Sequence, residues 1–410
     1  MDSPHPPVTP HDAQTAAGVS PYLEAAPLQA GDTVRLIAPS GPTDEESLLR
    51  AIAQLESWGL NVVLGDNVRA RHPRVKYLAG TDEQRRSDLV DAWCDPDTSA
   101  VIALRGGFGA MRLLDGIDFD LIRRHALRPD GRPKLLTGSS DITALHQAWD
   151  HHLSVATLFC PMVGNDPFKN STVVPAEVAT WLFEPWGGRE LGFPASDSEE
   201  TGVDPSDAPA AGSGTDRTFW SEKGAENMPR TSNLDRNEQG AQAQEGAQVQ
   251  AGTKSASSQL FGRPFSRART LVPGTAKGRL VGGNLSLVAA GMGSPELAGV
   301  RELRERSGPS VLMLEDVEEE LYRLDNLLVQ LVRGGWFDSA DAVVLGSWQD
   351  CAEIDDVEAL IMDYLGEAGI PIVSEMGFGH DPDAPSTPLG VNVTLEAPPR
   401  GRPRMWVDGA

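Results

Sequence analysis

The amino-terminal half of the chain repeats one local pattern, in which a short apolar run leads through a turn containing glycine into a helical stretch. The pattern occurs in TVRLIAPSGP with EESLLRAIAQLESWGL, in AVIALRGGFGAMRLL and in KLLTGSSDITALHQAW. Apolar side chains at helical spacing, such as Leu48, Ile52 and Leu55, indicate the helices. Units of this kind build parallel sheets, so the sequence predicts an α/β fold with its ligand site beyond the carboxyl ends of the strands.

The carboxyl-terminal part of the chain has a different pattern. Apolar runs in SVLMLED, DAVVLGSW and IPIVSEMGFGH alternate with one strong helix, EEELYRLDNLLVQLVRGG, which ends in two glycines. This pattern predicts a smaller, strand-rich mixed α/β domain over residues 265–410. The parallel-sheet domain is expected over residues 31–190.

Two segments lack the apolar side chains that a folded domain needs. Residues 1–30 are rich in Pro and Ala, and residues 195–257 contain the low-complexity run QGAQAQEGAQVQAG. Neither segment can bury enough surface to offset the entropy of ordering the chain. We therefore expect a disordered tail and a disordered acidic insertion between the two domains.

Charge and cysteine content exclude several classes of protein. With 35 Lys plus Arg against 59 Asp plus Glu, the formal net charge is −24, so neither nucleic acid nor an anionic membrane is an expected partner. The cysteines Cys94, Cys160 and Cys351 lack the spacing of a zinc site or a disulfide framework, which predicts a reducing compartment. No apolar run has the length of a signal peptide core or a membrane span. These observations predict a soluble cytoplasmic protein.

The tetrapeptide GSSD, residues 138–141, links an apolar strand directly to a helix. This is the geometry of a nucleophile elbow, in which a serine stands above the sheet while the helix's free N–H groups face the reacting group. Two explanations stay open for the tetrapeptide alone. Ser139 or Ser140 is a nucleophile, or both serines only cap the helix.

A serine nucleophile needs a base, and the base needs an orienting acid. His380 lies in the glycine-rich turn after the run IPIVSEM, although a histidine in such a turn is also common as an ordinary surface residue. Glu315 ends the apolar run SVLML, so we expect it at the end of a buried strand, where a carboxylate needs a partner. Asp316 and the glutamates that follow it are expected at a solvated helix start.

The run RGGFG, residues 105–109, forms a second glycine turn between a strand and a helix. It lacks the Lys-Ser or Lys-Thr of a P-loop and the spacing of a dinucleotide site. Its glycines either let backbone N–H groups approach a reacting carbonyl, as in an oxyanion hole, or only form the turn.

Six segments taken together resemble one family. In chain order they are RLIAPSGP, RGGFGAMRLL, GSSDITALH, GRLVGGNLS, LMLEDVEEELYRLD and GFGHDPDAPSTPLG, and they are similar to the LD-carboxypeptidases, also called muramoyltetrapeptide carboxypeptidases. The resemblance covers roughly residues 31–190 and 270–400. It implies a flavodoxin- or amidotransferase-like first domain, a swivelling second domain and a triad with Ser140 as nucleophile, Glu315 as orienting acid and His380 as general base.

The resemblance has further implications. The oxyanion donors would be the backbone N–H groups of Asp141 and of Gly106 or Gly107, with no metal and no organic cofactor. The substrate would be a small peptide, a peptidoglycan tetrapeptide that loses its terminal D-Ala during cytoplasmic wall recycling, and the protein would be a homodimer. Related microcin C immunity proteins instead hydrolyse a peptide-nucleotide antibiotic. A non-catalytic two-domain ligand-binding protein is a third alternative.

The chain departs from the family pattern at two places. Ser139 stands where relatives have an aromatic residue, which leaves two adjacent serines as candidates. The segment TLFCP, residues 157–161, replaces a TFHGP motif, so a histidine contact of the relatives is absent.

Overall fold

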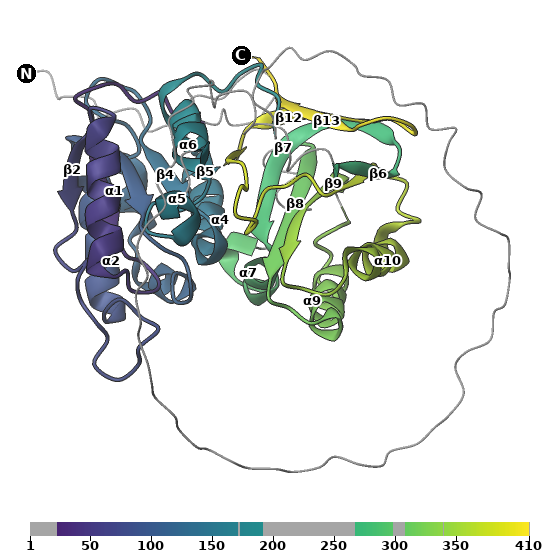
Figure 1. The fold of residues 1–410 in the computed structure, drawn as a ribbon, viewed down its shortest axis with the longest axis horizontal. Helices are drawn as coiled ribbons and strands as arrows, with labels where there is room; N and C mark the ends of the chain where they lie inside the picture. Colours follow the sequence, from purple (N-terminus) through teal and green to yellow (C-terminus); the bar gives the residue numbers. More distant parts are fainter. Residues whose placement is uncertain (1–22, 171–172, 192–266, 298–307, 339, 410) are drawn as a thin grey trace, which may run out of the picture. The chain divides into compact units, whose positions relative to one another are not determined.

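The computed structural model of the 410-residue chain describes residues 23–170, 173–191, 267–297, 308–338 and 340–409 (Figure 1). Most of the predicted tail and the whole predicted insertion, residues 195–257, lie outside the described residues. The described residues all belong to one compact unit, which contains two sheets. None of the helices within these ranges is long and apolar enough to cross a membrane.

The first sheet has the strand order β11-β5-β4-β3-β1-β2. All its neighbouring strands are parallel except β11, which pairs antiparallel with β5. The strands are β1 (Thr33–Ile37), β2 (Asn61–Leu64), β3 (Thr98–Ala103), β4 (Leu135–Gly138), β5 (Thr157–Phe159) and β11 (Thr387–Leu389). The predicted parallel α/β sheet is confirmed, and its last strand comes from the far end of the chain.

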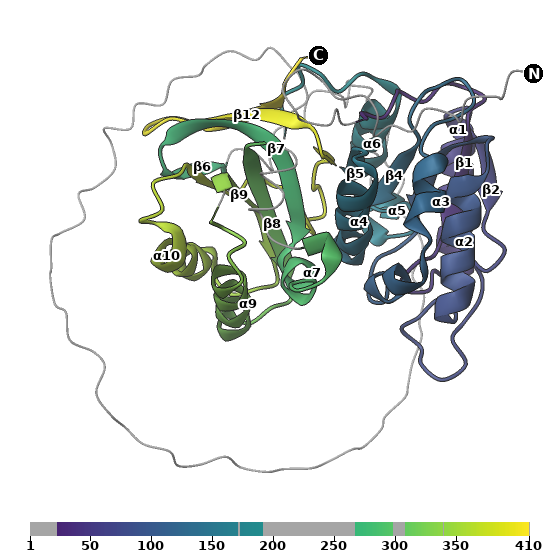
Figure 2. The ribbon, with the colours of Figure 1, turned by 180° about the vertical axis from the view of Figure 1, so that it is seen from behind.

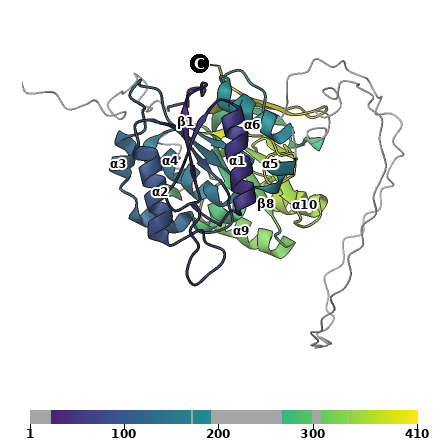
Figure 3. The ribbon, with the colours of Figure 1, turned by 60° about the vertical axis from the view of Figure 1, so that its left-hand side comes forward.

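Helices cover both faces of the first sheet (Figure 3). Alternate residues of β3 explain this, because Ile102 packs into one apolar cluster and Val101 into another. The first cluster includes side chains of α1 (Glu45–Ser57), α5 (Asp166–Asn170) and α6 (Val173–Phe183). The second includes side chains of α2 (Asp82–Cys94), α3 (Phe119–Arg124) and α4 (Thr143–Leu153).

The second sheet is mixed and has the order β13-β12-β7-β8-β9-β10-β6 (Figures 1 and 2). Its four central strands, from β7 to β10, are parallel, and the outer pairs are antiparallel. The strands are β6 (Arg269–Val272), β7 (Gly274–Asn284), β8 (Ser310–Val317), β9 (Ala340–Gln349), β10 (Ile372–Ser374), β12 (Asn392–Ala397) and β13 (Arg404–Val407). This sheet confirms the predicted mixed, strand-rich second domain.

The two faces of the second sheet also pack into different apolar clusters. Met313 of β8 packs into the apolar cluster shared with α1 and α6, whereas Leu312 and Leu314 pack with three helices of this half. Those helices are α7 (Leu285–Ala290), α9 (Leu321–Arg333) and α10 (Ile354–Leu365). One apolar cluster therefore contains residues of both sheets.

Part of the predicted tail, residues 23–30, packs against the first domain. Leu23 forms a β-bridge with Val155, and Leu28 is buried and donates its backbone N–H to Leu182 O at 2.8 Å. The described chain thus begins before the predicted boundary at Gly31, because two leucines in an otherwise aperiodic segment find apolar neighbours.

Polar contacts also join the two halves. The carboxylate of Glu177 on α6 accepts hydrogen bonds from Ser386 N at 2.9 Å and Ser386 Oγ at 2.6 Å, immediately before β11. His152, at the end of α4, lies 3.0 Å from Glu296 of the second half. The segment between His380 and β11 is thereby attached to the first domain.

We expect Glu177→Gln to stabilise the protein at alkaline pH. Burial raises the pKa of Glu177 to about 7, although the Ser386 hydrogen bonds and Arg189 act in the opposite direction. A carboxyl group whose pKa is raised by folding contributes fully to the free energy of unfolding below its pKa in the unfolded chain. That contribution is lost as the pH rises through the folded-state pKa of about 7. A glutamine side chain at this position would keep both contacts without charge, so the gain in unfolding free energy should be near zero at pH 4 and on the order of 2 kcal/mol at pH 8.

Urea unfolding at several pH values measures this difference. Glu190→Gln is a control of opposite sign, because Arg404 and Arg402 outweigh burial and lower the pKa of Glu190. That variant should lose stability at pH 8. A Glu177→Gln effect that does not change with pH would contradict the prediction.

Candidate active site

The turn after β4 holds Ser140 in a strained backbone conformation. Ser139 is extended and buried, with φ −144°, whereas Ser140 is partly exposed and has φ +59°. A non-glycine residue at positive φ is uncommon, and a serine in this position at a strand-to-helix turn is the geometry of a nucleophile elbow. The backbone therefore distinguishes the two serines and places Ser140 at the apex.

Buried polar groups hold this turn. The Asp141 carboxylate accepts hydrogen bonds from Ser40 Oγ at 2.5 Å and Ala110 N at 2.8 Å, which joins the turns that follow β1, β3 and β4. Gly138 O interacts with His146 Nε2 at 2.9 Å, and His146 Nδ1 lies 2.8 Å from Thr157 Oγ1. Burial lowers the pKa of His146 to about 4, so the neutral imidazole donates from Nε2 and accepts at Nδ1.

The second glycine turn lies against Ser140. A Cβ atom added to Gly106 would lie 3.0 Å from Ser140 Cβ and 3.2 Å from Ser140 Oγ. Gly106 O accepts a hydrogen bond from Gly41 N at 3.0 Å. Within the described chain, the N–H groups of Gly106 and Gly107 have no hydrogen-bond acceptor. Free backbone donors on a turn that packs against the serine are suited to an oxyanion hole.

A buried carboxylate and a histidine form the second part of the site. Glu315 lies on β8 with no exposed surface, and its Oε2 is 2.6 Å from Nδ1 of His380. Ser347 Oγ accepts a hydrogen bond from His380 N at 3.0 Å, which fixes the backbone of the histidine turn. Gly379 is required there, because its φ is +127° and a Cβ would lie 2.7 Å from Glu315 Oε2.

The carboxylate also sets the charge state of the histidine. Burial by itself lowers the pKa of His380, but the charge of Glu315 and its hydrogen bond outweigh burial, and the pKa is raised above its ordinary value. A carboxylate on Nδ1 leaves Nε2 as the nitrogen that can exchange a proton with another group.

Asp316 does not lie where the sequence placed it. It was expected at a solvated helix start, but it belongs to β8, is buried, and accepts hydrogen bonds from Asn284 Nδ2 at 2.9 Å and Ser286 N at 2.9 Å. Burial, with the charge of Glu315, raises the pKa of Asp316. The strand runs on to Val317, two residues past the end expected at Glu315, because these polar partners satisfy the Asp316 carboxylate.

Asn284 is a residue whose role the sequence did not reveal. Its side chain donates to Glu315 Oε1 at 3.3 Å, and its backbone N–H donates to Thr143 Oγ1 at 3.1 Å in the helix that follows the elbow. The motif GRLVGGNLS contains it, and the adjacent Gly283 allows the close approach because a Cβ there would lie 2.7 Å from Thr143 Oγ1. Asn284 thus links the Glu315–His380 pair to the Ser140 turn.

The structure brings the predicted residues together in two groups. Ser140 lies against Gly106 and directly before Asp141, and Glu315 is bonded to His380. No hydrogen bond among the described residues joins Ser140 Oγ to His380. In the same residues, no group of three or more His, Cys, Asp or Glu is arranged to hold a metal ion.

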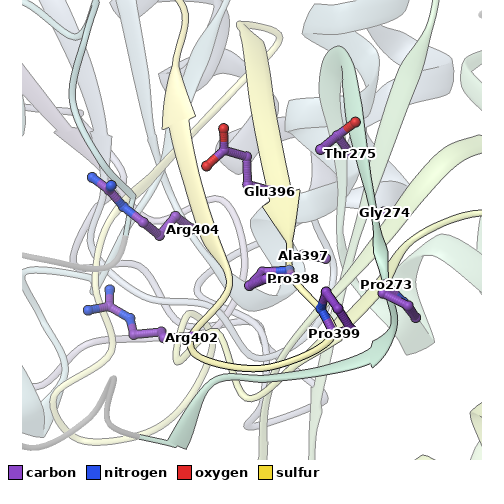
Figure 4. Close-up of a pocket in the computed structure, with 9 residues that line it drawn as sticks. All are labelled: Pro273, Gly274, Thr275, Glu396, Ala397, Pro398, Pro399, Arg402 and Arg404. Atoms are coloured by element: carbon purple, nitrogen blue, oxygen red, sulfur yellow. The ribbon is translucent and has the colours of Figure 1, made fainter. Parts of the chain in front are cut away.

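A surface hollow of about 520 Å³ lies elsewhere, at the start of β7, the end of β12 and the start of β13 (Figure 4). Prolines, Glu396 and two arginines line it, and Arg404 is paired with Glu190 at 2.7 Å. It contains none of the predicted site residues.

Two α/β domains, a serine on a strained strand-to-helix turn and a buried Glu–His pair are features of hydrolases that use a serine nucleophile. The chain belongs to the LD-carboxypeptidase family. Residues 34–160 match the family's N-terminal domain, and residues 277–395 match its C-terminal domain. The chain is therefore a member of a family of carboxypeptidases.

Individual relatives agree with this assignment. A carboxypeptidase homologue of Streptomyces coelicolor is 34% identical, over 92% of this chain and 94% of the relative. The murein tetrapeptide carboxypeptidase of Pseudomonas aeruginosa is 28% identical, over 88% and 92%.

Solved structures show the same fold. The muramoyltetrapeptide carboxypeptidase of Oxalobacter formigenes has a TM-score of 0.62 at 22% identity, with coverage of 92% of this chain and 99% of that one. The microcin C7 self-immunity protein MccF has a TM-score of 0.65 at 20% identity, with coverage of 95% and 99%.

We expect Gly106→Ala to reduce turnover without unfolding the protein. The added methyl group would press on Ser140, whose Cβ and Oγ would lie only 3.0 and 3.2 Å away. A shift of a reacting atom by a few tenths of an ångström to 1 Å lowers rates by up to about a hundredfold. The measurement is kcat on a peptide substrate together with the melting temperature.

Gly409→Ala is the matched control, because a Cβ at Gly409 meets nothing within 4 Å. A Gly106→Ala enzyme with unchanged kcat would show that the glycine turn does not bear on the serine.

Proposed function

We propose that this protein is a serine-type LD-carboxypeptidase that hydrolyses the amide before the terminal D-Ala of peptidoglycan tetrapeptides. The observation that carries the proposal is the Glu315–His380 hydrogen bond of 2.6 Å in a chain whose other domain presents Ser140 at a strained elbow. The murein tetrapeptide carboxypeptidase named among the relatives supports the substrate class. We place the activity in cytoplasmic wall recycling and expect a homodimer that needs no metal or organic cofactor.

In the proposed mechanism, His380 Nε2 accepts the proton of Ser140 as its Oγ attacks the scissile carbonyl. Glu315 holds Nδ1–H, stabilises the imidazolium that forms and keeps the correct tautomer. The imidazolium then protonates the departing amine of D-Ala. Water attacks the acyl-enzyme with the same histidine as base, which returns Ser140.

The proposed oxyanion hole consists of backbone donors. The N–H of Asp141 follows the nucleophile, and the N–H of Gly106 or Gly107 lies on the opposite turn, which touches Ser140. Donors of this kind stabilise the negative oxygen of the tetrahedral intermediate, and they are already oriented before the reaction. The Asp141 carboxylate holds the elbow to the turns after β1 and β3 through Ser40 and Ala110.

A second candidate function is hydrolysis of a peptide-nucleotide amide, as in the microcin immunity proteins. The similarity of the fold to MccF, with a TM-score of 0.65, supports this second candidate. Side-by-side assays of a muropeptide and an aspartyl sulfamoyl nucleotide distinguish the two substrates. A non-catalytic binding protein, the third alternative, would not react with a serine-directed covalent probe.

Ser140→Ala should abolish hydrolysis of an L,D-tetrapeptide, whereas Ser139→Ala should retain most of it. Removal of a nucleophile typically lowers kcat by about a thousandfold or more, and Ser139 is buried at an extended position. Mass spectrometry of purified muropeptides would detect the loss of one alanine. The reverse result would assign the attack to Ser139, and full activity in both variants would overturn the serine mechanism.

The pH dependence of kcat/KM should follow the protonation state of His380. Its pKa is raised, so kcat/KM for the free enzyme should increase with pH and reach its plateau only above the ordinary histidine pKa. Glu315→Gln removes the charge that raises this pKa, so the acidic limb should move to lower pH. The plateau should fall by about ten-thousandfold, because the tautomer is no longer held. An unchanged limb in the variant would contradict the role of Glu315.

A further inference from the structure

Arg105 is an arginine of the predicted oxyanion turn itself, and its guanidinium has no acidic partner within the described residues. Arg69 pairs with Glu45 and Arg112 with Asp82, whereas no carboxylate in the described ranges lies within ion-pair distance of Arg105. Its side chain is exposed, and within the described part of the chain it makes one hydrogen bond, from Nη1 to Pro42 O at 3.3 Å. The chain has a net charge of −24, yet this guanidinium beside the predicted oxyanion turn is exposed and has no carboxylate partner among the described residues. It is therefore available to bind an anionic group of a ligand.

Arg105 lies next to the reacting atoms through the close packing of two turns. A Cβ atom placed on Gly41 would lie 2.8 Å from Gly106 O and 3.7 Å from Arg105 Nε. Gly106 in turn lies against Ser140, as described above. The guanidinium therefore lies over the turn after β1, beside the loop that would hold the carbonyl under attack.

Two residues close to these turns, Tyr77 and Phe108, carry exposed aromatic rings. Tyr77 and Phe108 are 53% and 54% exposed, and their rings form an edge-to-face pair with centroids 5.7 Å apart. The Tyr77 carbonyl lies 3.6 Å from the Cβ position of Gly41. Exposed aromatic side chains packed together beside a catalytic turn form an apolar wall that a small side chain can contact.

We propose that Arg105 binds the terminal carboxylate of the peptide substrate, with Tyr77 and Phe108 in contact with the side chain of the terminal residue. This inference rests on the proposed peptidase function and adds the group that would make the enzyme an exopeptidase. In the terminal residue a single Cα joins the scissile amide nitrogen to the carboxylate, so a cation beside the oxyanion turn is placed to reach it. A guanidinium binds a carboxylate through two parallel hydrogen bonds, which fixes the orientation of the peptide as well as its charge.

The same arrangement explains how an acidic protein holds an acidic substrate. Long-range repulsion from a net negative chain opposes binding of a carboxylate, whereas a local cation at contact distance outweighs distant charges that salt screens. Arg105 would thus select peptides with a free carboxyl end and reject internal peptide bonds.

The test compares one L,D-tetrapeptide with its terminal carboxamide, in which the terminal carboxylate is replaced by a neutral group. In Arg105→Gln, kcat/KM for the acid should fall by about 30-fold, as expected for loss of a charge-assisted hydrogen bond, and the value for the amide should change by less than about twofold. Arg50→Gln is the matched control, because it removes the same charge from an exposed residue of α1 that pairs with Glu46. An equal fall on both peptides, or no fall on either, would overturn the inference.

A binding measurement separates this inference from the peptidase proposal. In a Ser140→Ala background, calorimetry with the same two peptides needs no turnover, and the acid should bind more tightly than the amide only when Arg105 is present. If the wild type releases no alanine while this preference is observed, the peptidase proposal fails and the carboxylate site stands. If neither peptide binds, or if the preference survives Arg105→Gln, the carboxylate site is refuted.

Discussion

The hydrogen bond between Glu315 and His380 is the interaction on which the rest of the site depends. A carboxylate without exposed surface is costly unless it is paired, and here one of its oxygens is bonded to His380 and the other to Asn284. The pairing requires a glycine at residue 379 and a serine at residue 347, which together place the histidine turn against the end of β8. A few contacts in the second domain therefore orient the His380 imidazole, whose proposed partner, Ser140, lies in the first domain.

In the first domain, backbone strain and buried polar groups orient Ser140. Ser140 adopts a positive φ because the surrounding contacts hold it there: Asp141 joins three turns, and the neutral His146 binds the carbonyl of Gly138. Strain of this kind persists only when neighbouring structure determines it. The Thr143–Asn284 contact then connects the elbow helix to the strand ends of the second sheet.

Local periodicity was enough to predict the parallel first sheet and the mixed second sheet, and the expected burial of Glu315 indicated that its carboxylate needs a partner. It could not predict contacts that depend on distant parts of the chain. Asp316 looks in sequence like the start of an acidic helix, yet Asn284 and Ser286 keep it in the strand. Likewise, two adjacent serines are equivalent in sequence, and the folded backbone separates them by the positive φ of Ser140 and the burial of Ser139. Leu23 and Leu28 lie in a segment of low periodicity and are fixed by Val155 and Leu182.

The crossing of β11 into the first sheet has a consequence for synthesis on the ribosome. Strands β1 to β5 leave the ribosome early, but the edge of β5 is covered only when residues 387–389 have been made. Until then the nascent first domain presents an open strand edge, which is a site for mispairing with other chains. Completion of the fold is therefore coupled to the arrival of His380, so the sheet that bears Ser140 closes at nearly the same moment as its proposed base is delivered.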